Sequence, residues 1–322
     1  MEKNILDKSK NIKFLEAMID EIFFSKSFLN KATFNLSPFY SNLEKNLIFS
    51  LKKINDQRCL GYIKSHITSY DKDTVILKEH REQGNLKARL IKNYNFNDEL
   101  IIINTAGGLT SGDLNVNLII VSNNVNLNIT TQSMEKIYFC KNISSYNYIN
   151  IVVGSNSYVS WLPLETIFFN GGKLRRRINI ELAAKSSFLG IETIIFGRKA
   201  MGEKVIKGNL DDAWQIYQNG TLVYSDFNRI SGNISKKLSH KLVMRGNCIL
   251  CNIVFVGKKI KTYKRKILNN IPDSKHMAGV SIVNGVLLLK VLAKDISDIR
   301  LFLEKLFYVF DKNFNVPKLW RS

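Results

Sequence analysis

Residues 101–138 read IIINTAGGLTSGDLNVNLIIVSNNVNLNITTQSMEKIY, and this stretch decides the fold class. An apolar run ends in a turn that holds Gly107, Gly108 and Gly112, and apolar and polar residues then alternate over 114–118 and 125–130. Alternation with a period of two, bounded by turn residues, is typical of β-strands. Closely spaced glycines indicate positive φ or close backbone approach. The stretch therefore predicts two strands joined to a glycine-rich corner.

The glycine-rich corner does not have the features of a phosphate-binding loop. It lacks the Lys-Ser/Thr ending of a P-loop, and the residues after it predict a strand where a phosphate site needs a helix N-terminus. We therefore expect a structural turn that places Asp113 at an edge or in a cavity.

Short strands separated by turns are predicted from about residue 59 to residue 282. Turn clusters occur at 154–156, 170–172, 185–187 and 218–220. The pair Asn219-Gly220 predicts a two-residue hairpin, because both residue types tolerate positive φ. Many short strands without intervening helices favour an antiparallel or mixed all-β body over an α/β fold. No fixed-period repeat of the solenoid type is evident in the sequence.

Helices are predicted at the two ends of the chain. Apolar residues recur at helical spacing within residues 1–57, which we interpret as a helical N-terminal extension to a β-rich domain at 58–322. The extension is expected to cover a sheet face or, alternatively, to bind a partner. A C-terminal helix is predicted to start after Asp295, with apolar positions from Ile296 to Phe310.

Composition predicts a soluble cytoplasmic protein. The 322 residues are 45% hydrophobic and 23% charged, which is ordinary for a globular chain. No apolar run has the length of a membrane span, and the first residues do not resemble a secretory signal. The four cysteines are scattered, as expected in a reducing compartment.

The formal net charge of +20 raises the question of a polyanionic partner. Nucleic acid is one candidate, since lysine and arginine neutralise phosphates. Dispersed lysines are also explained by compositional drift, and an acidic protein partner would be attracted by the same field. Arg175, Arg176 and Arg177 form a dense basic cluster and are candidates for partner contact.

Motifs for catalysis or tight metal binding are not found. Cys248 and Cys251 have CxxC spacing inside a strand-like run, where positions three apart point to opposite faces, so burial is favoured over zinc binding. The four histidines lack metal-ligand spacing, and no GxSxG motif is present. We therefore expect a protein without catalytic residues and without a tightly bound cofactor.

Carboxylates inside the predicted strands are the most informative polar residues. Glu165 follows Trp161 and Pro163, and Glu192 and Glu203 lie in apolar or glycine-rich segments. Buried carboxylates must pair with a cation or face water. Two hypotheses remain open: structural ion pairs with nearby basic residues, or a hydrated passage lined by carboxylates that suits a hard or borderline cation.

An ordered set of motifs over about residues 60–322 resembles the urease accessory protein UreD family, also called UreH. The matching segments are Arg81–Lys87, Gly107-Gly108, Gly112-Asp113, Thr131-Gln132, Lys136–Tyr138, Trp161–Ile167, Arg175–Arg177, Glu192, Gly197-Arg198, Gly202-Glu203 and Pro317–Trp320. The resemblance implies a β-helix-like stack of mixed strands with a few helices. Within it, Gly107, Gly108, Gly112, Trp161, Pro163, Gly197 and Glu203 are expected to be structural.

The resemblance also implies a non-enzymatic role in urease maturation. Expected partners are UreF, the GTPase UreG through UreF, and apo-urease, with no nucleic acid and no membrane, and with nickel bound at most transiently. A polar tunnel as the nickel route agrees with the hydrated-passage hypothesis. Its candidate residues are Asp113, Glu165 and Glu192, with Arg198 and Lys136 balancing their charge. The alternatives are a basic β-rich nucleic-acid-binding protein and, more distantly, a β-helix polysaccharide hydrolase.

Overall fold

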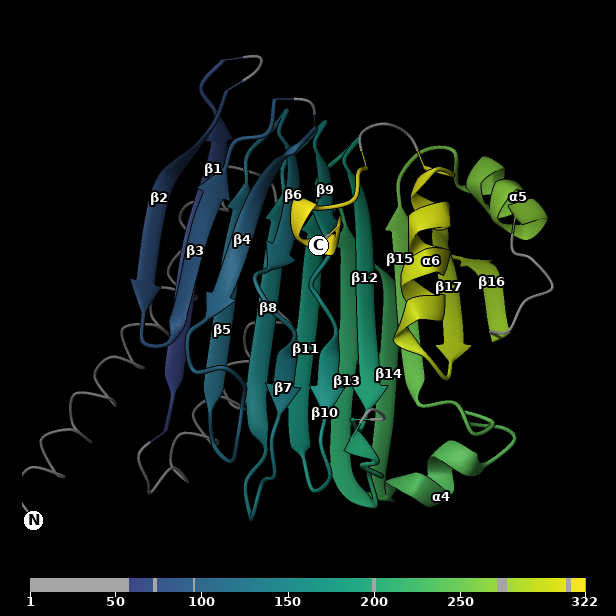
Figure 1. The fold of residues 1–322 in the computed structure, drawn as a ribbon. Coiled ribbons are helices and arrows are strands. Elements are labelled where there is room, and N and C mark those ends of the chain that lie inside the picture. Colours follow the sequence, from purple (N-terminus) through teal and green to yellow (C-terminus); the bar gives the residue numbers. More distant parts are fainter. Residues whose placement is uncertain are drawn as a thin grey trace, which may run out of the picture. The chain divides into compact units, whose positions relative to one another are not determined.

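A computed structural model describes residues 58–71, 74–94, 96–198, 201–270, 277–310 and 314–321. From Cys59 onward the chain forms one compact unit, in which strands dominate and build a β-solenoid of about four turns (Figure 1). The expectation of a mainly β, helix-like stack of strands is thus confirmed. The predicted helical extension at 1–57 lies outside the described residues.

The first of two sheets has seven strands. Their spatial order is β14 (Thr221–Asn233), β13 (Lys207–Gln218), β11 (Lys173–Leu182), β8 (Ser145–Val153), β5 (Leu114–Val121), β1 (Leu60–Ser69) and β2 (Val75–Gln83). The five inner strands are parallel, and the edge strands β2 and β14 pair antiparallel with their neighbours.

The second sheet faces the first and has ten strands. Its main path is β16 (Met277–Val283), β17 (Val286–Ala293), β15 (Ile249–Val256), β12 (Ser187–Phe196), β9 (Tyr158–Trp161), β6 (Asn126–Thr131), β4 (Asp98–Asn104) and β3 (Leu86–Ile91). Off this path, β10 (Thr166–Phe168) pairs with β12, and β7 (Glu135–Ile137) pairs with β10. From β4 to β13 the chain passes back and forth between the sheets, with β6–β7 and β9–β10 as consecutive strands of the second sheet, so each turn of the solenoid adds to both sheets.

Turns that lead from the first sheet to the second are stacked on one another. Asn124, Asn156 and Lys185 all adopt positive φ, and they are 32 and 29 residues apart. The Asn123 side chain accepts a hydrogen bond from the backbone N–H of Ser155 in the next turn, at 2.7 Å. The solenoid therefore repeats in space with an inexact sequence period, which explains why no fixed repeat is evident in the sequence.

The glycine-rich corner joins β4 to β5, as predicted, and a strand follows it. Gly112 has φ +78, in the left-handed region that favours glycine. A Cβ at Gly108 would lie 2.6 Å from the carbonyl oxygen of Lys136, so backbone passes directly over this residue. The predicted hairpin at Asn219-Gly220 is also present, with φ values of +50 and +77, between β13 and β14.

The described helices are α4 (Ile234–Ser239), α5 (Ile260–Asn270), α6 (Ile296–Phe307) and the short 3-10 helix η3 (Lys318–Arg321). Helices α5, α6 and η3 lie on the outer side of the second sheet, whereas α4 packs against β13 and β14 of the first sheet. In Figure 1, α6 lies beside β15 and β17. The predicted C-terminal helix is confirmed: α6 starts after Asp295 and buries Ile299, Leu303 and Leu306 in an apolar core. A separate apolar core lies between the two sheets.

Candidate functional site

The inner face of the first sheet changes from polar to apolar along its strands. Asn115, Asn147, Arg176 and Asp212 are register neighbours on β5, β8, β11 and β13, and they form one polar row across the sheet. Two residues further along each strand, this face carries Asn117 and then mainly apolar residues of the central core. Since neighbouring strands lie about 4.8 Å apart, the row extends about 14 Å along the solenoid.

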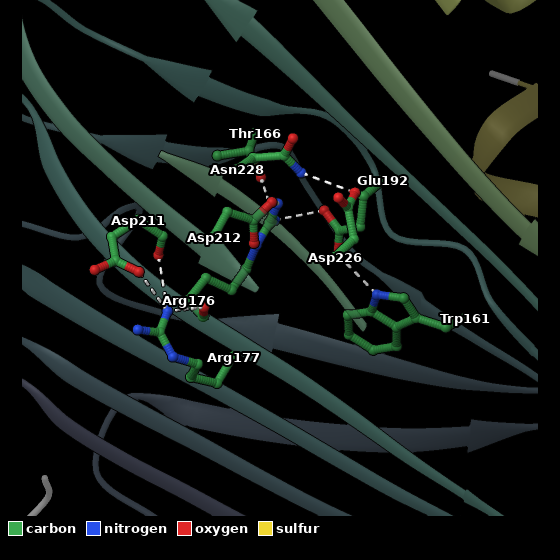
Figure 2. A network of polar contacts seen from close by, with 9 residues as sticks. All are labelled: Trp161, Thr166, Arg176, Arg177, Glu192, Asp211, Asp212, Asp226 and Asn228. Carbon is green, nitrogen blue, oxygen red and sulfur yellow. Dashed lines mark hydrogen bonds and ion pairs between the residues drawn. The ribbon is translucent and has the colours of Figure 1, made fainter. Parts of the chain in front are cut away.

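Arg176 is the centre of a buried network that connects the two sheets (Figure 2). Its Nε and Nη2 donate to Oδ1 and Oδ2 of Asp212, at 2.8 and 3.0 Å. Its Nη1 donates to Glu192 on the opposite sheet and to the hydroxyl of Thr166. Trp161 Nε1 donates to the other oxygen of Glu192, at 2.8 Å. The guanidinium thus holds together residues from both layers of the solenoid.

Burial and charge act in opposite directions on this network. Burial opposes ionisation of Arg176, but the carboxylates of Asp212 and Glu192 raise its pKa further above the ordinary value. Burial raises the pKa of Glu192, and the Arg176 guanidinium only partly offsets that effect. Arg176 is therefore a permanent cation between two acidic groups.

A cavity of about 50 Å³, lined by both polar and apolar side chains, lies beside the network, between the sheets. Its volume is enough for about four water molecules. Side chains that line it include Asn104, Asn115, Asn117, Glu135, Asn147, Trp161, Thr166, Arg176 and Glu192. The buried Oδ1 of Asn117 accepts no hydrogen bond from the described residues, as expected of an atom that faces water.

Glu135 is the acidic group of this cavity without an ion-pair partner among the described residues. Both of its carboxylate oxygens accept from Asn104 Nδ2, at 3.1 Å. Burial raises the pKa of Glu135 from 4.5 to about 7, and the Asn104 hydrogen bond only partly counteracts the shift. The cavity therefore contains a carboxyl group that exchanges its proton near neutral pH.

A larger groove of about 1140 Å³ lies on the other side of the second sheet, beneath α6 and the C-terminal segment. Glu165 lies in this groove and forms a bidentate ion pair with Arg300 of α6, with Nε–Oε1 at 3.0 Å and Nη2–Oε2 at 3.3 Å. Pro163 and Leu164 line both the groove and the cavity. The segment at 161–166 is thus the wall between the internal cavity and the outer groove.

The structure separates the five residues proposed for the passage. Glu192 lines the cavity, whereas Glu165 lies in the outer groove. Asp113 is buried in the glycine-rich corner, where it accepts from the backbone N–H groups of Cys59 and Thr110. Lys136 and Arg198 are exposed and do not line the cavity.

Charge is balanced by cations other than the expected ones. Arg176 pairs with Glu192, and Arg300 pairs with Glu165. Arg198 instead pairs with Glu203, at 2.8 Å. The expectation that Arg198 and Lys136 compensate the proposed acids is therefore corrected, because sequence proximity did not indicate which strands face each other.

The arginine cluster divides between the two faces of β11. Arg176 points inward and only 3% of its side chain is exposed, so it is not available for partner contact as proposed. Arg175 and Arg177 point to the opposite face, where both pair with Asp211. Alternation along a strand accounts for this division.

The motif residues expected to be structural have clear packing roles. Trp161 orients Glu192, and Pro163 is buried in the wall segment. Gly197 has φ +85, and the carbonyl oxygen of Glu203 would lie 2.8 Å from a Cβ at this position. The Glu203 side chain accepts hydrogen bonds from Asn170 and Arg198, and so holds this surface loop together.

Sequence reasoning missed two acidic residues of the site and one basic surface. Asp212 follows Asp211 in β13, and two consecutive acids within a predicted strand were a usable signal. Glu135 immediately precedes the Lys136–Tyr138 motif. The basic surface belongs to residues 258–266, which hold six lysines and arginines and no acidic residue.

Tight metal binding finds no support in the described part of the chain. No group there of three or more histidine, cysteine, aspartate or glutamate side chains could hold a metal ion. Cys248 and Cys251 are both free thiols. Within the same residues, no helix is both long and apolar enough to cross a bilayer.

Comparisons with known proteins assign the family. The family model described as UreD urease accessory protein matches residues 64–321. The chain is 32% identical over 244 residues to a urease accessory protein UreD of Rhizobium johnstonii, and the matched residues cover 76% of this chain and 89% of that protein. A urease accessory protein UreD of Xanthobacter autotrophicus is 30% identical over 246 residues, covering 76% and 84% respectively. The chain therefore belongs to the UreD family of urease accessory proteins.

Proposed function

We propose that this chain is a non-enzymatic scaffold in urease maturation, which binds apo-urease and UreF and through UreF recruits the GTPase UreG. In this proposal it acts in the cytoplasm and supports delivery of nickel to the urease active site. Family membership supports an accessory role toward urease. The cavity between the sheets, with Glu135 and Glu192 in its wall, is the observation that supports nickel passage.

The charge of the cavity suits a divalent cation. Glu192, whose pKa burial raises, and Asp212 flank the single positive charge of Arg176. Glu135 adds a negative charge to the cavity when it is ionised, so the acidic groups around the cavity outnumber the one cation. In an interior of low dielectric constant, such an excess attracts a cation with charge +2.

The chemistry of the lining favours passage over storage. Carboxylate and amide oxygens bind hard or borderline cations, and the lining offers both types on Glu135, Glu192 and the asparagines. A closed cage of cysteine and histidine would hold nickel tightly. An ion that exchanges among dispersed oxygens and water is free to move on to another protein.

Complementation tests the scaffold role. A urease operon that lacks its own UreD would be co-expressed with or without this chain, and urease activity and co-purification with UreF would be measured. We expect activity and UreF binding only when the chain is present. An inactive urease, together with no binding to either UreF or urease, would contradict the proposal.

A further inference from the structure

β16 forms one edge of the second sheet. β16 hydrogen-bonds to β17 on one side, and no described strand pairs with its other side. The other edge strands, β2, β3 and β14, all contain charged residues, whereas β16 reads MAGVSIV and has neither charge nor proline. Edge strands that lack charges and proline are open to pairing with another chain.

β16 is firmly held on one face and open on the other. Ala278, Val280 and Ile282 pack against the apolar core beneath α6. The alternate residues of the strand point to the opposite face, where Met277 and Val283 are 41% and 46% exposed. The backbone of the strand is therefore fixed in an extended conformation, while its edge and outer face remain accessible.

A basic helix lies beside this edge. α5 packs against β16 and is anchored by the buried residues Tyr263 and Ile267. Its exposed side carries Lys261, Arg265 and Lys266. No ion pair joins these three to an acidic residue within the described parts of the chain, so their charge is available to a ligand.

We propose that the β16 edge binds an extended, acidic segment of a partner protein, which adds a strand to the ten-stranded sheet. Backbone groups of the segment would pair with β16, and its carboxylates would pair with the cations of α5. A second copy of this chain fits less well, because it would bring an equally basic α5 to the contact. A nucleic acid would satisfy α5 but has no backbone to pair with the strand.

Peptide binding to the full chain tests this proposal. The probe is a capped peptide of about eight residues, a common strand length, in which valine alternates with glutamate. Binding would be followed by fluorescence anisotropy, and the site would be located by hydrogen exchange with mass spectrometry. We expect saturable binding with new amide protection at 277–283. The matched peptides carry one central proline, or lysine in place of glutamate, and both are expected to bind at least about tenfold more weakly.

Charge reversal on the protein separates the α5 surface from the overall positive charge. The variant Lys261→Glu/Arg265→Glu is expected to weaken peptide binding about tenfold. The control Lys236→Glu/Lys237→Glu makes the same change in net charge on the exposed face of α4 and is expected to leave affinity within about twofold.

Four results would overturn the proposal. The first would be failure of the acidic peptide to bind at concentrations up to about 1 mM. The second would be equal binding of the proline peptide and the parent peptide, which would mean that charge attraction alone explains the binding. The third would be protection of α5 from hydrogen exchange by an RNA oligomer, with no protection of 277–283 by the peptide, which would assign the surface to nucleic acid. The fourth would be dimerisation of the chain through 277–283 in light scattering and hydrogen-exchange experiments, which would assign the edge to a second copy.

Discussion

Replacing Arg176 by methionine should remove the cation on which the inner network depends. Arg176 donates two hydrogen bonds to Asp212 and one to Glu192, and all three side chains are almost fully buried. Methionine fills much of the same volume but leaves both carboxylates without a countercharge. The variant therefore tests the electrostatics of the network with little change in packing.

The expected loss follows from burial. Removing one partner of a buried ion pair costs about 3–5 kcal/mol, because an uncompensated charge remains in the interior. We expect a loss of about 4 kcal/mol in the free energy of unfolding at pH 7.5. The loss should be smaller at pH 5, since carboxyl groups that have lost their cation take up protons more readily in the folded state.

Urea denaturation followed by tryptophan fluorescence measures this loss. The neighbouring Arg177→Met variant is the matched control: its partner Asp211 keeps Arg175 and Arg229, so the expected loss is below about 1 kcal/mol. A triple variant that adds Glu192→Gln and Asp212→Asn to Arg176→Met should recover most of the lost stability. An Arg176→Met loss below about 1 kcal/mol, or a triple variant no more stable than the single one, would refute the reasoning.

Three further perturbations have defined outcomes. The pKa of Glu135 is raised from 4.5 to about 7, so the folded state keeps the Glu135 proton to a higher pH than the unfolded state, and the free energy of unfolding should fall as pH rises from about 4.5 to about 7. Urea titrations at several pH values should show that Glu135→Gln abolishes up to about 3 kcal/mol of that decrease. Arg300→Leu should cost about 1–2 kcal/mol, since Glu165 loses its half-exposed cation, and hydrogen exchange in α6 should accelerate; unchanged exchange would contradict this. Gly108→Ala should lower the free energy of unfolding by at least about 2 kcal/mol, because the new Cβ would meet the backbone at Lys136, whereas Gly107→Ala has open space at its Cβ and should cost about 1 kcal/mol. Calorimetry measures both losses, and equal losses would contradict the packing argument.

Local features of the fold were predictable because their causes are local. The alternation after the glycine-rich corner, the turn at Asn219-Gly220 and the apolar spacing of α6 each depend on residues within one element. The solenoid pairing was not predictable in this way, since most of its parallel strands pair with another strand about 30 residues away. The turns at Asn124, Asn156 and Lys185 are the remaining trace of that period in the sequence.

The site was predictable only in part, because alternation does not say which face of a strand is interior. Asn115 and Asn117 alternate with leucine and valine as surface residues do, but both are buried and line the cavity. Glu192 stood out because it lies in an apolar strand. Its cation, Arg176, is 16 residues away, and the cation of Glu165 is 135 residues away, so neither pairing followed from sequence proximity.

The nickel content of urease matured with cavity variants tests the central claim most directly. Asn117→Leu places an apolar side chain in the cavity, and Asn150→Leu is its matched control, a buried asparagine on the opposite face of the same sheet. Urease would be purified after co-expression with equal amounts of each folded variant, and its nickel would be measured by mass spectrometry. The account predicts reduced nickel with Asn117→Leu and normal nickel with Asn150→Leu. Equal nickel content with the two variants would contradict passage through the cavity.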